Sequence, residues 1–550
     1  MRLFITGVLY LLIGLTALSA QNIVQPDQNK NKIQEQYAGK ITFLAKPKTI
    51  EQLSEEDLIA AFELKEGASL DARIFLRNSL TNYLHLLDES LTPEELAQNG
   101  NFQFAFYVDD KLIYTENLNS GAGTIASKNQ WTTFRLPFIS PSNEDSWGRY
   151  LWGRFYFAKG GEDALFEGKH ILKIEIRPFL KTEDGIKTGG IIAEGQIDFI
   201  TPIIHLTQKQ TAIQPIQKGS GWRISKDQFD YKLVQEMNAR ILENRFKNIT
   251  SIAVLKNNKL LLEEYFNGAT RNTLHDTRSV GKSFASTMTG IAIKDGYIKD
   301  ENQSLNTFYN LNGYANYSSE KDSISLKNLL TMSSAFEGSD MNNNSPGNEE
   351  NMYPTDNWIK FTLDLPIDKT KINGKQWDYF TAGVVVIGDI LNMKVPGGLE
   401  TYAEKQLFEP LGISHYQWQY TPQKVANTAG GLGLETLSLA KYGQLYKNKG
   451  NWKGKQILSQ DWVEKSFRNY FPESQSNDGY GFLFWREVFE INGTTHEAYA
   501  CSGNGGNKVY VFKDIPFVIV ITATAYNQPY AHPQVKKIMS NYILPAVLDR

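Results

Sequence analysis

The hydrophobic pattern of the chain changes once, across a polar stretch at residues 205–221. This stretch is rich in glutamine and lysine and ends in Gly219-Ser220-Gly221, a composition that is typical of a linker. The chain has 550 residues, of which 41% are hydrophobic and 21% charged, so it is long enough for two domains with separate cores. We therefore predict a front domain at residues 25–204 and a second domain at residues 222–550.

The front domain contains short runs of β-branched and aromatic residues between polar or glycine-containing turns. These runs are Ile41–Leu44, Phe102–Val108, Phe155–Phe157 and Ile171–Ile176. Asp109-Asp110 has the character of a hairpin turn, and one helix is expected near residues 92–97. Short alternating strands favour an all-β, sandwich-like accessory domain. Such a domain is a candidate for binding a partner, or a carbohydrate through Trp147, Tyr150 and Trp152, although such aromatic residues more often belong to a core.

The first residues have the pattern of an export signal. Arg2 precedes an apolar stretch from Leu3 to Leu18, and small residues at positions 19 and 20 come before a polar segment. We predict a signal peptide at residues 1–20 and a secreted or periplasmic protein with no stable membrane span after signal removal. An uncleaved membrane anchor is the alternative. Cys501 is the only cysteine, so an intramolecular disulfide is excluded.

The charge balance argues against nucleic acid as a partner, because the formal net charge is −3 and no basic block is present. The seven histidines are scattered and show no metal-ligand spacing. We expect no metal and no cofactor, and a small-molecule or peptide-like substrate.

The second domain mixes helices and strands. Hydrophobic periodicity predicts helices at residues 231–246 and 279–294, and a final helix that begins at Pro533. Hairpins are predicted at residues 252–266 and 508–524. Because hairpins occur near both ends of this domain, we predict an antiparallel sheet whose strands come from both ends, flanked by helices and joined to a helical region. The fold class is therefore α+β.

A nucleophile and a neighbouring base occur at the start of the helix predicted at 279–294. Ser279 and Lys282 are three residues apart, which places their side chains on one helix face with Cβ atoms about 5–6 Å apart. A serine hydroxyl needs a base within hydrogen-bond reach, and a partly neutral lysine can serve as that base. A helix N-terminus also presents N–H groups toward developing negative charge. The pattern indicates acyl transfer.

The same spacing occurs at two other places, so spacing alone does not identify the nucleophile. Ser318 and Lys321 lie in a polar loop, and Ser438 and Lys441 lie on a predicted helix. We expect both of these pairs to be surface residues.

Three other chemistries have less support. Gly281-Lys282-Ser283 has the ending of a phosphate-binding loop, but Asp276 stands where that motif needs a glycine. No Gly-x-Ser-x-Gly elbow is present, which argues against an α/β-hydrolase. His496 and Cys501 would form a thiol-protease pair, but no third group is placed to orient them.

Four stretches follow Ser279 along the chain: Ile324–Ser334, Gly374–Tyr379, Gly430–Leu434 and Ser502–Asn507. Together with Ser279 and Lys282, they resemble the beta-lactamase-related serine hydrolases, a broad family of class C beta-lactamases, D-Ala-D-Ala carboxypeptidases and related esterases and amidases. The resemblance covers roughly residues 222–550 and leaves the front domain unmatched. It implies a beta-lactamase/transpeptidase-like fold for the second domain.

The resemblance implies that Tyr379 shares proton transfer with Lys282. An earlier Tyr-x-Asn begins at Tyr314, but it precedes the stretch Ile324–Ser334, so chain order favours Tyr379. Thr381 stands where the family has an asparagine, and it keeps a hydroxyl but lacks the amide.

The third motif also departs from the family. Cys501-Ser502-Gly503 stands where the family often has a lysine or histidine, whose cation helps to bind the carboxylate of a penicillin or of a peptide terminus. Cysteine supplies no such cation, and we expect Cys501 to be a small buried residue. We interpret Thr381, Cys501, Ser502 and Gly503 as substrate-binding positions, and we expect an uncharged ester or amide substrate.

The prediction is an exported serine hydrolase that forms an acyl-enzyme on Ser279, with Lys282 and Tyr379 as proton-transfer groups. Two alternatives stay open. The first is D-Ala-D-Ala carboxypeptidase or beta-lactamase-type activity, and the second is a catalytically degenerate protein that binds a cell-wall or polymer ligand.

Overall fold

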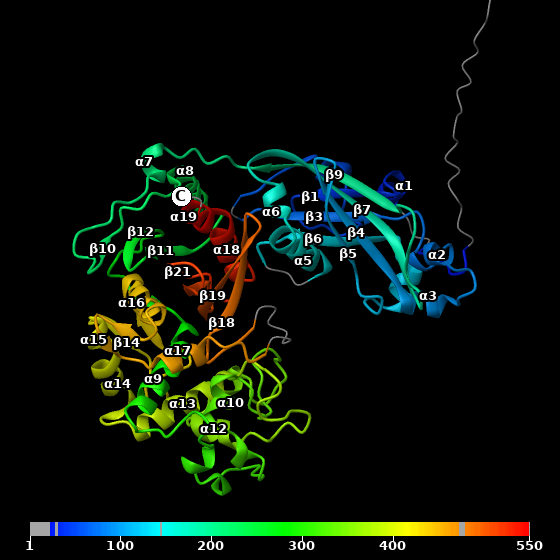
Figure 1. Cartoon of the computed structure of the whole chain (residues 1–550). Helices are drawn as coiled ribbons and strands as arrows, with labels where there is room; N and C mark the ends of the chain where they lie inside the picture. The colour runs from blue at the N-terminus through cyan, green and yellow to red at the C-terminus, as the bar shows by residue number, and fades with distance from the viewer. Residues whose placement is uncertain (1–21, 28–30, 66, 143–145, 472–478, 549–550) are drawn as a thin grey trace, which may run out of the picture. The chain divides into compact units, whose positions relative to one another are not determined.

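The computed structural model describes residues 22–548, apart from 28–30, 66, 143–145 and 472–478 (Figure 1). The predicted signal peptide, residues 1–20, lies outside the described residues. The chain divides into two units, Met1–His205 and Leu206–Arg550. The division falls at the start of the polar stretch 205–221.

Within the described part of the first unit, nine strands form one sheet in the order β5-β4-β7-β9-β1-β3-β6, with β2 beside β9 and β8 beside β7. The strands are β1 (Lys40–Leu44), β2 (Ala61–Glu63), β3 (Leu70–Phe75), β4 (Gly100–Val108), β5 (Lys111–Asn117), β6 (Thr133–Ile139), β7 (Gly168–Thr182), β8 (Gly185–Thr188) and β9 (Ala193–Thr201). The hairpin predicted at Asp109-Asp110 is confirmed: both residues have positive φ, as a type I′ turn between β4 and β5 requires.

The first unit is rich in strands, as predicted, but in its described residues helices take the place of the second sheet that a sandwich would have. They include α2 (Leu80–His85), α3 (Pro93–Asn99), α4 (Ile125–Gln130) and α5 (Trp147–Trp152). Leu84, Leu96 and Leu151 of these helices share one core with Phe104 and Ile174 of the sheet. The helix expected near 92–97 is confirmed as α3.

The strand predicted at Phe155–Phe157 is wrong. Residues Gly153–Ala158 continue α5 as a π-helical segment. Trp152, Phe155 and Tyr156 then lie on one helix face, and all three are buried in the core. A short aromatic run fits a strand and a buried helix equally well, which explains the error.

Within the described part of the second unit, seven strands form a sheet in the order β10-β12-β11-β21-β20-β19-β18. The strands are β10 (Arg223–Ile224), β11 (Ile249–Lys256), β12 (Lys259–Tyr265), β18 (Trp485–Ile491), β19 (Thr494–Gly503), β20 (Asn507–Phe512) and β21 (Phe517–Ala523). The early strand β11 pairs with the late strand β21 in antiparallel fashion. The prediction of an antiparallel sheet built from both ends of the domain is therefore confirmed for β12, β11, β21, β20, β19 and β18, whereas the two-residue edge strand β10 pairs with β12 in parallel fashion.

Helices cover both faces of this sheet (Figure 1). One face packs against α8 (Tyr231–Leu242), α18 (Ala531–Ile538) and α19 (Leu544–Leu548). The other face packs against α9 (Val280–Lys294) and α16 (Thr436–Lys447), beyond which lies the helical region with α10 (Leu326–Leu330), α12 (Trp358–Asp364) and α13 (Thr381–Lys394). Helix α8 ends earlier than the predicted residue 246, because Asn244 adopts a positive φ of 59°.

Part of the polar stretch 205–221 is held by the second unit. It contains the short helix α7 (Gln208–Thr211). The backbone N–H of Gln214 donates to Glu264 Oε1 at 2.8 Å, and its Nε2 donates to the carbonyl oxygen of Tyr265 at 2.7 Å. Gln214 Oε1 also accepts from the N–H of Tyr265 at 3.2 Å. The stretch therefore lies along the end of β12.

Among the described residues, no single helix is both long and apolar enough to cross a membrane. The segments Thr381–Lys394 and Gly398–Leu411 meet the length and composition test only as a pair, and the pair is bent by 79°.

Candidate active site

Ser279 and Lys282 form a hydrogen-bonded pair at the start of α9. Ser279 is the residue that precedes the first turn of the helix, and it is partly exposed. Lys282 Nζ lies 2.8 Å from Ser279 Oγ and donates to the carbonyl oxygen of Ala429 at 2.5 Å. Lys282 is only 2% exposed. The structure therefore places an amine beside the candidate nucleophile, at a site largely protected from water.

The backbone turns sharply just before Ser279. Arg278 has a φ of +52°, in the left-handed region that costs a non-glycine residue about 1 kcal/mol or more. Its guanidinium lies 4.6 Å from the ring centroid of Tyr526, and its Nε lies 3.0 Å from Asp276 Oδ2. These contacts stabilise the turn that presents Ser279 at the helix N-terminus.

Two glycine-containing segments pack against this turn. Thr277 Oγ1 donates to the carbonyl oxygen of Leu432 at 2.7 Å, in the stretch Gly430–Leu434. A Cβ built on Gly503 would lie 2.0 Å from the carbonyl oxygen of Thr277 and 3.2 Å from the nitrogen of Val280. Two of the four stretches that were singled out in the sequence therefore lie next to Ser279. They are Gly430–Leu434 and the stretch at the end of β19.

Tyr379 completes the predicted group of three. Lys282 Nζ lies 5.2 Å from the centroid of the Tyr379 ring. The ring stacks on Trp485 of β18, with centroids 5.8 Å apart and planes inclined by 26°. Trp377 lies against both rings, at 6.3 Å from Tyr379 and 5.6 Å from Trp485. The structure thus brings together Ser279, Lys282 and Tyr379. The contacts of Trp377 and Trp485 with the Tyr379 ring were not indicated by sequence patterns.

Thr381 begins α13 and is 2% exposed. Its backbone N–H donates to Asp340 Oδ2 at 2.6 Å, so Asp340 satisfies a free donor at the helix N-terminus. Burial and the neighbouring Glu349 raise the pKa of Asp340, although the hydrogen bonds that it accepts oppose this shift. The predicted contact of Thr381 with substrate stays a prediction, and its side chain is buried in this structure.

The third motif contributes backbone more than side chains. Cys501 is 0% exposed, packs in the core that contains α9, and burial raises the pKa of its thiol to about 12. Since side chains alternate along a strand, Ser502 belongs to the opposite face of β19 from Cys501 and Gly503. Of these three residues, Gly503 makes the close approach to the turn before Ser279. The expectation that Cys501 is a small buried residue is confirmed.

The two competing Ser-x-x-Lys pairs are not arranged for catalysis. Lys321 Nζ donates to the carbonyl oxygens of Ala315 and Leu363, at 3.0 and 2.8 Å. Lys441 Nζ donates to the carbonyl oxygen of Gly412 at 2.5 Å. The expectation of surface positions is wrong for one residue of each pair, because Lys321 is 0% exposed and Ser438 is 2% exposed, whereas Ser318 and Lys441 are partly exposed. Among the described residues, neither lysine is hydrogen-bonded to the serine three residues before it, in contrast to Lys282.

The described residues are not arranged for thiol-protease chemistry or for metal binding. His496 Nδ1 lies 2.8 Å from Asp514 Oδ2, and His496 belongs to the opposite face of β19 from Cys501, since the two are five residues apart. Among the described residues, no group of three or more histidine, cysteine, aspartate or glutamate side chains is arranged to hold a metal ion.

The Beta-lactamase family model matches residues 242–536. Similar solved structures include a family VIII carboxylesterase, at 14% identity over 59% of this chain and 98% of that chain, with a TM-score of 0.45. A hydrolase with promiscuous acyltransferase activity matches at 11% identity over 56% of this chain and 97% of that chain, with a TM-score of 0.45. A penicillin-binding protein homologue from Caulobacter crescentus matches at 13% identity over 56% of this chain and 96% of that chain, with a TM-score of 0.43.

A search of the curated proteins gave no match. The family model, in contrast, matches residues 242–536 of a chain of 550 residues, which is more than half of it. This protein therefore belongs to the Beta-lactamase family, a family of serine hydrolases.

Proposed function

We propose that this protein is an exported serine hydrolase that cleaves an ester or amide bond through an acyl-enzyme on Ser279. The observation that carries the proposal is the 2.8 Å separation of Lys282 Nζ and Ser279 Oγ, with Lys282 buried and Ser279 partly exposed. An amine this close can take the hydroxyl proton directly. Export to the periplasm or the medium is supported by the N-terminal signal pattern.

The first step forms the acyl-enzyme. Ser279 Oγ bonds to the substrate carbonyl carbon while its proton passes to Lys282 Nζ, with Tyr379 as the second proton-transfer group. Lys282 Nζ also donates to the carbonyl oxygen of Ala429, and this hydrogen bond holds the amine beside Ser279. Collapse of the tetrahedral intermediate returns the proton to the departing alcohol or amine.

Backbone N–H groups would hold the oxyanion in both steps. The N–H of Ser279 lies at the N-terminus of α9, where the helix dipole favours negative charge. The N–H of Asn504, the residue after Gly503, is the second proposed donor. A water molecule then attacks the acyl carbon and gives its proton to Tyr379 or Lys282. The bond from that carbon to Ser279 Oγ breaks, the proton returns to Ser279 Oγ, and the carboxylic acid product leaves.

The proposed substrate is an uncharged ester or amide. Support comes from position 501, where a buried cysteine stands instead of a cation that would bind a carboxylate. The first unit is proposed as an accessory module that binds a partner or a carbohydrate.

A substrate panel tests the function. Wild type, Ser279→Ala and Ser318→Ala would be run on p-nitrophenyl esters, anilides, D-Ala-D-Ala peptides and nitrocefin, and labelled with a fluorophosphonate probe. We expect Ser279→Ala to lose turnover by at least about 10³-fold and to lose labelling. Ser318→Ala, which changes the serine of a competing pair, should match wild type.

Two results would count against the proposal. Labelling that survives Ser279→Ala would remove the nucleophile assignment, and nitrocefin turnover equal to ester turnover would remove the proposed substrate class. If the wild type is inert toward the whole panel and unlabelled, a ligand-binding role explains the protein better.

A further inference from the structure

The segment that carries Tyr379 has no regular secondary structure to hold it. Among the described residues, 368–380 belong to no helix or strand, and α13 begins only at Thr381. A misplacement of about 1 Å can cost an enzyme about 100-fold in rate, so a catalytic phenol on a loop depends on the contacts of its neighbours.

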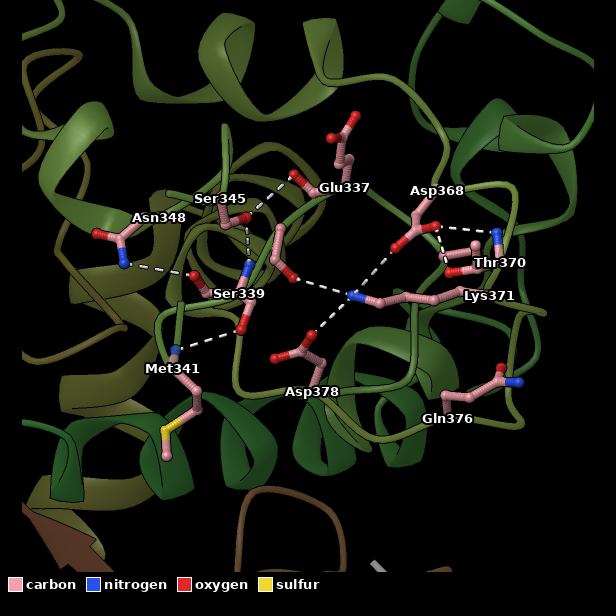
Figure 2. A network of polar contacts seen from close by, with 12 residues as sticks. Glu337, Ser339, Met341, Ser345, Asn348, Asp368, Thr370, Lys371, Gln376 and Asp378 are labelled. Carbon is pink, nitrogen blue, oxygen red and sulfur yellow. Dashed lines mark hydrogen bonds and ion pairs between the residues drawn. The ribbon is translucent and has the colours of Figure 1, made fainter. Parts of the chain in front are cut away.

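One ammonium group joins three parts of this loop region. Lys371 Nζ lies 2.7 Å from Asp378 Oδ2, 3.9 Å from Asp368 Oδ2 and 3.5 Å from the carbonyl oxygen of Gly338 (Figure 2). The side chains of Lys371 and Asp378 are only 16% and 23% exposed. The ion pair is therefore partly shielded from water, where charge-assisted hydrogen bonds are stronger than at a free surface.

Two of the three parts that Lys371 joins, Asp378 and the segment that begins at Gly338, are in contact with Tyr379 or its neighbours. Asp378 directly precedes Tyr379, and its N–H donates to the carbonyl oxygen of Met332 at 2.8 Å. On the other side, the N–H of Asp340 donates to the carbonyl oxygen of Tyr379 at 2.8 Å. A Cβ built on Gly338 would lie 2.2 Å from Cε2 of Phe380, so these two residues are also in close contact.

We infer that Lys371 is a positioning residue for Tyr379. Its ammonium ties Asp378 to the segment Gly338–Asp340, and the two segments together hold the backbone of Tyr379 from both sides. The phenol then stays beside Lys282, where proton transfer needs it. This inference rests on the proposed function, because the position of Tyr379 matters only if the site catalyses.

Lys371→Met tests the inference, since it removes the charge and keeps most of the aliphatic stem. On a p-nitrophenyl ester we expect kcat to fall about 10- to 100-fold while KM changes less than about 3-fold. Lys371→Arg keeps a cation that can reach Asp378, and it should stay within about 5-fold of wild type. Lys360→Met is the matched control, because Lys360 pairs with Asp364 on α12 and should show wild-type kinetics.

A double-mutant cycle separates positioning of Tyr379 from a general structural role. In a Tyr379→Phe background, Lys371→Met should change kcat by less than about 3-fold, because the group that it positions is already absent. A full 10- to 100-fold loss on top of Tyr379→Phe would overturn the inference, and so would a wild-type kcat in Lys371→Met. If Lys371→Met does not fold, Asp378→Asn replaces it in the same cycle with the same expected values.

The two proposals fail differently. If Ser279→Ala or Tyr379→Phe retains wild-type turnover, the proposed function is wrong at that residue. If both variants lose turnover but Lys371→Met does not, only the positioning role of Lys371 is wrong.

Discussion

The backbone of Gly503 lies against the carbonyl group of Thr277, two residues before Ser279. A Cβ on Gly503 would come within 2.0 Å of that oxygen, a distance that real Cβ atoms do not reach. The neighbouring atoms are backbone, so neither side can move without shifting β19 or the turn before α9. The absence of a side chain at this position is therefore what allows the third motif to reach the nucleophile.

Gly503→Ala should accordingly damage the site. We expect kcat/KM on an ester to fall at least about 100-fold, because β19 is displaced from the turn that presents Ser279. Gly313→Ala serves as the control, since a Cβ there meets nothing within 4 Å and its φ is ordinary. Steady-state kinetics and a thermal melt on both variants check the prediction. Full activity in Gly503→Ala would contradict the close contact.

Cys501 should be dispensable for turnover. Its side chain is 0% exposed, and burial raises the pKa of the thiol to about 12, so little thiolate exists at neutral pH. We expect Cys501→Ala to keep kcat/KM within about 3-fold of wild type and to lose about 1 kcal/mol of unfolding free energy. Native protein should also resist iodoacetamide. A loss of turnover above 100-fold in a folded Cys501→Ala variant would instead favour thiol chemistry.

Glu264 should make the stability of the second unit depend on pH. Its carboxyl is 0% exposed, and burial raises its pKa from 4.5 to about 8. A raised pKa means that the folded state binds the proton more tightly than the unfolded state does. The stabilisation is therefore full below about pH 4.5 and is lost as the pH rises through about 8. Urea unfolding from pH 5 to pH 9 should show a loss on the order of a few kcal/mol.

Glu264→Gln should remove that dependence. The amide oxygen of the new glutamine still accepts from the N–H of Gln214. Asn238 now donates to Glu264 Oε2, and its Oδ1 has no hydrogen-bond partner among the described residues. If the Asn238 amide rotates, this Oδ1 can accept from the NH₂ group of the glutamine. The variant should exceed wild type in unfolding free energy at pH 8 and approach it near pH 5. An equal pH slope in both proteins would show that Glu264 is not the titrating group.

The sequence predicted those features that depend on local spacing. Ser279 and Lys282 meet because they are three residues apart on a helix. Strand β11 reads as an unbroken apolar run because Ile252 and Val254 enter one core while Ala253 and Leu255 enter the other. That pattern marks a central strand covered on both faces.

Features that depend on distant contacts could not be predicted. Lys321 lies in a polar segment, and only the fold reveals the carbonyl groups of Ala315 and Leu363 that allow its burial. The ion pair of Lys371 and Asp378 belongs to a loop, where no periodicity relates one residue to another. The helical segment at Phe155 was predicted as a strand, because an aromatic run considered in isolation favours a strand. Tertiary packing decides whether such a run forms a strand or a helix.

Lys128 should contribute strongly to the stability of the first unit. It is 5% exposed, and its ammonium donates to the carbonyl oxygens of Ala97, Gly100 and Ser120 at 2.6, 2.9 and 2.5 Å. Lys128→Met fills similar space but leaves these three acceptors without their donor, which should cost about 2–4 kcal/mol of unfolding free energy.

Lys111→Met, at an exposed position on β5, is the control and should cost less than about 0.5 kcal/mol of unfolding free energy. Because Lys128 lies in the first unit, ester turnover in both variants should match wild type under conditions where they stay folded. Urea denaturation measures the first expectation, and equal stability of the two variants would show that the three hydrogen bonds contribute nothing net.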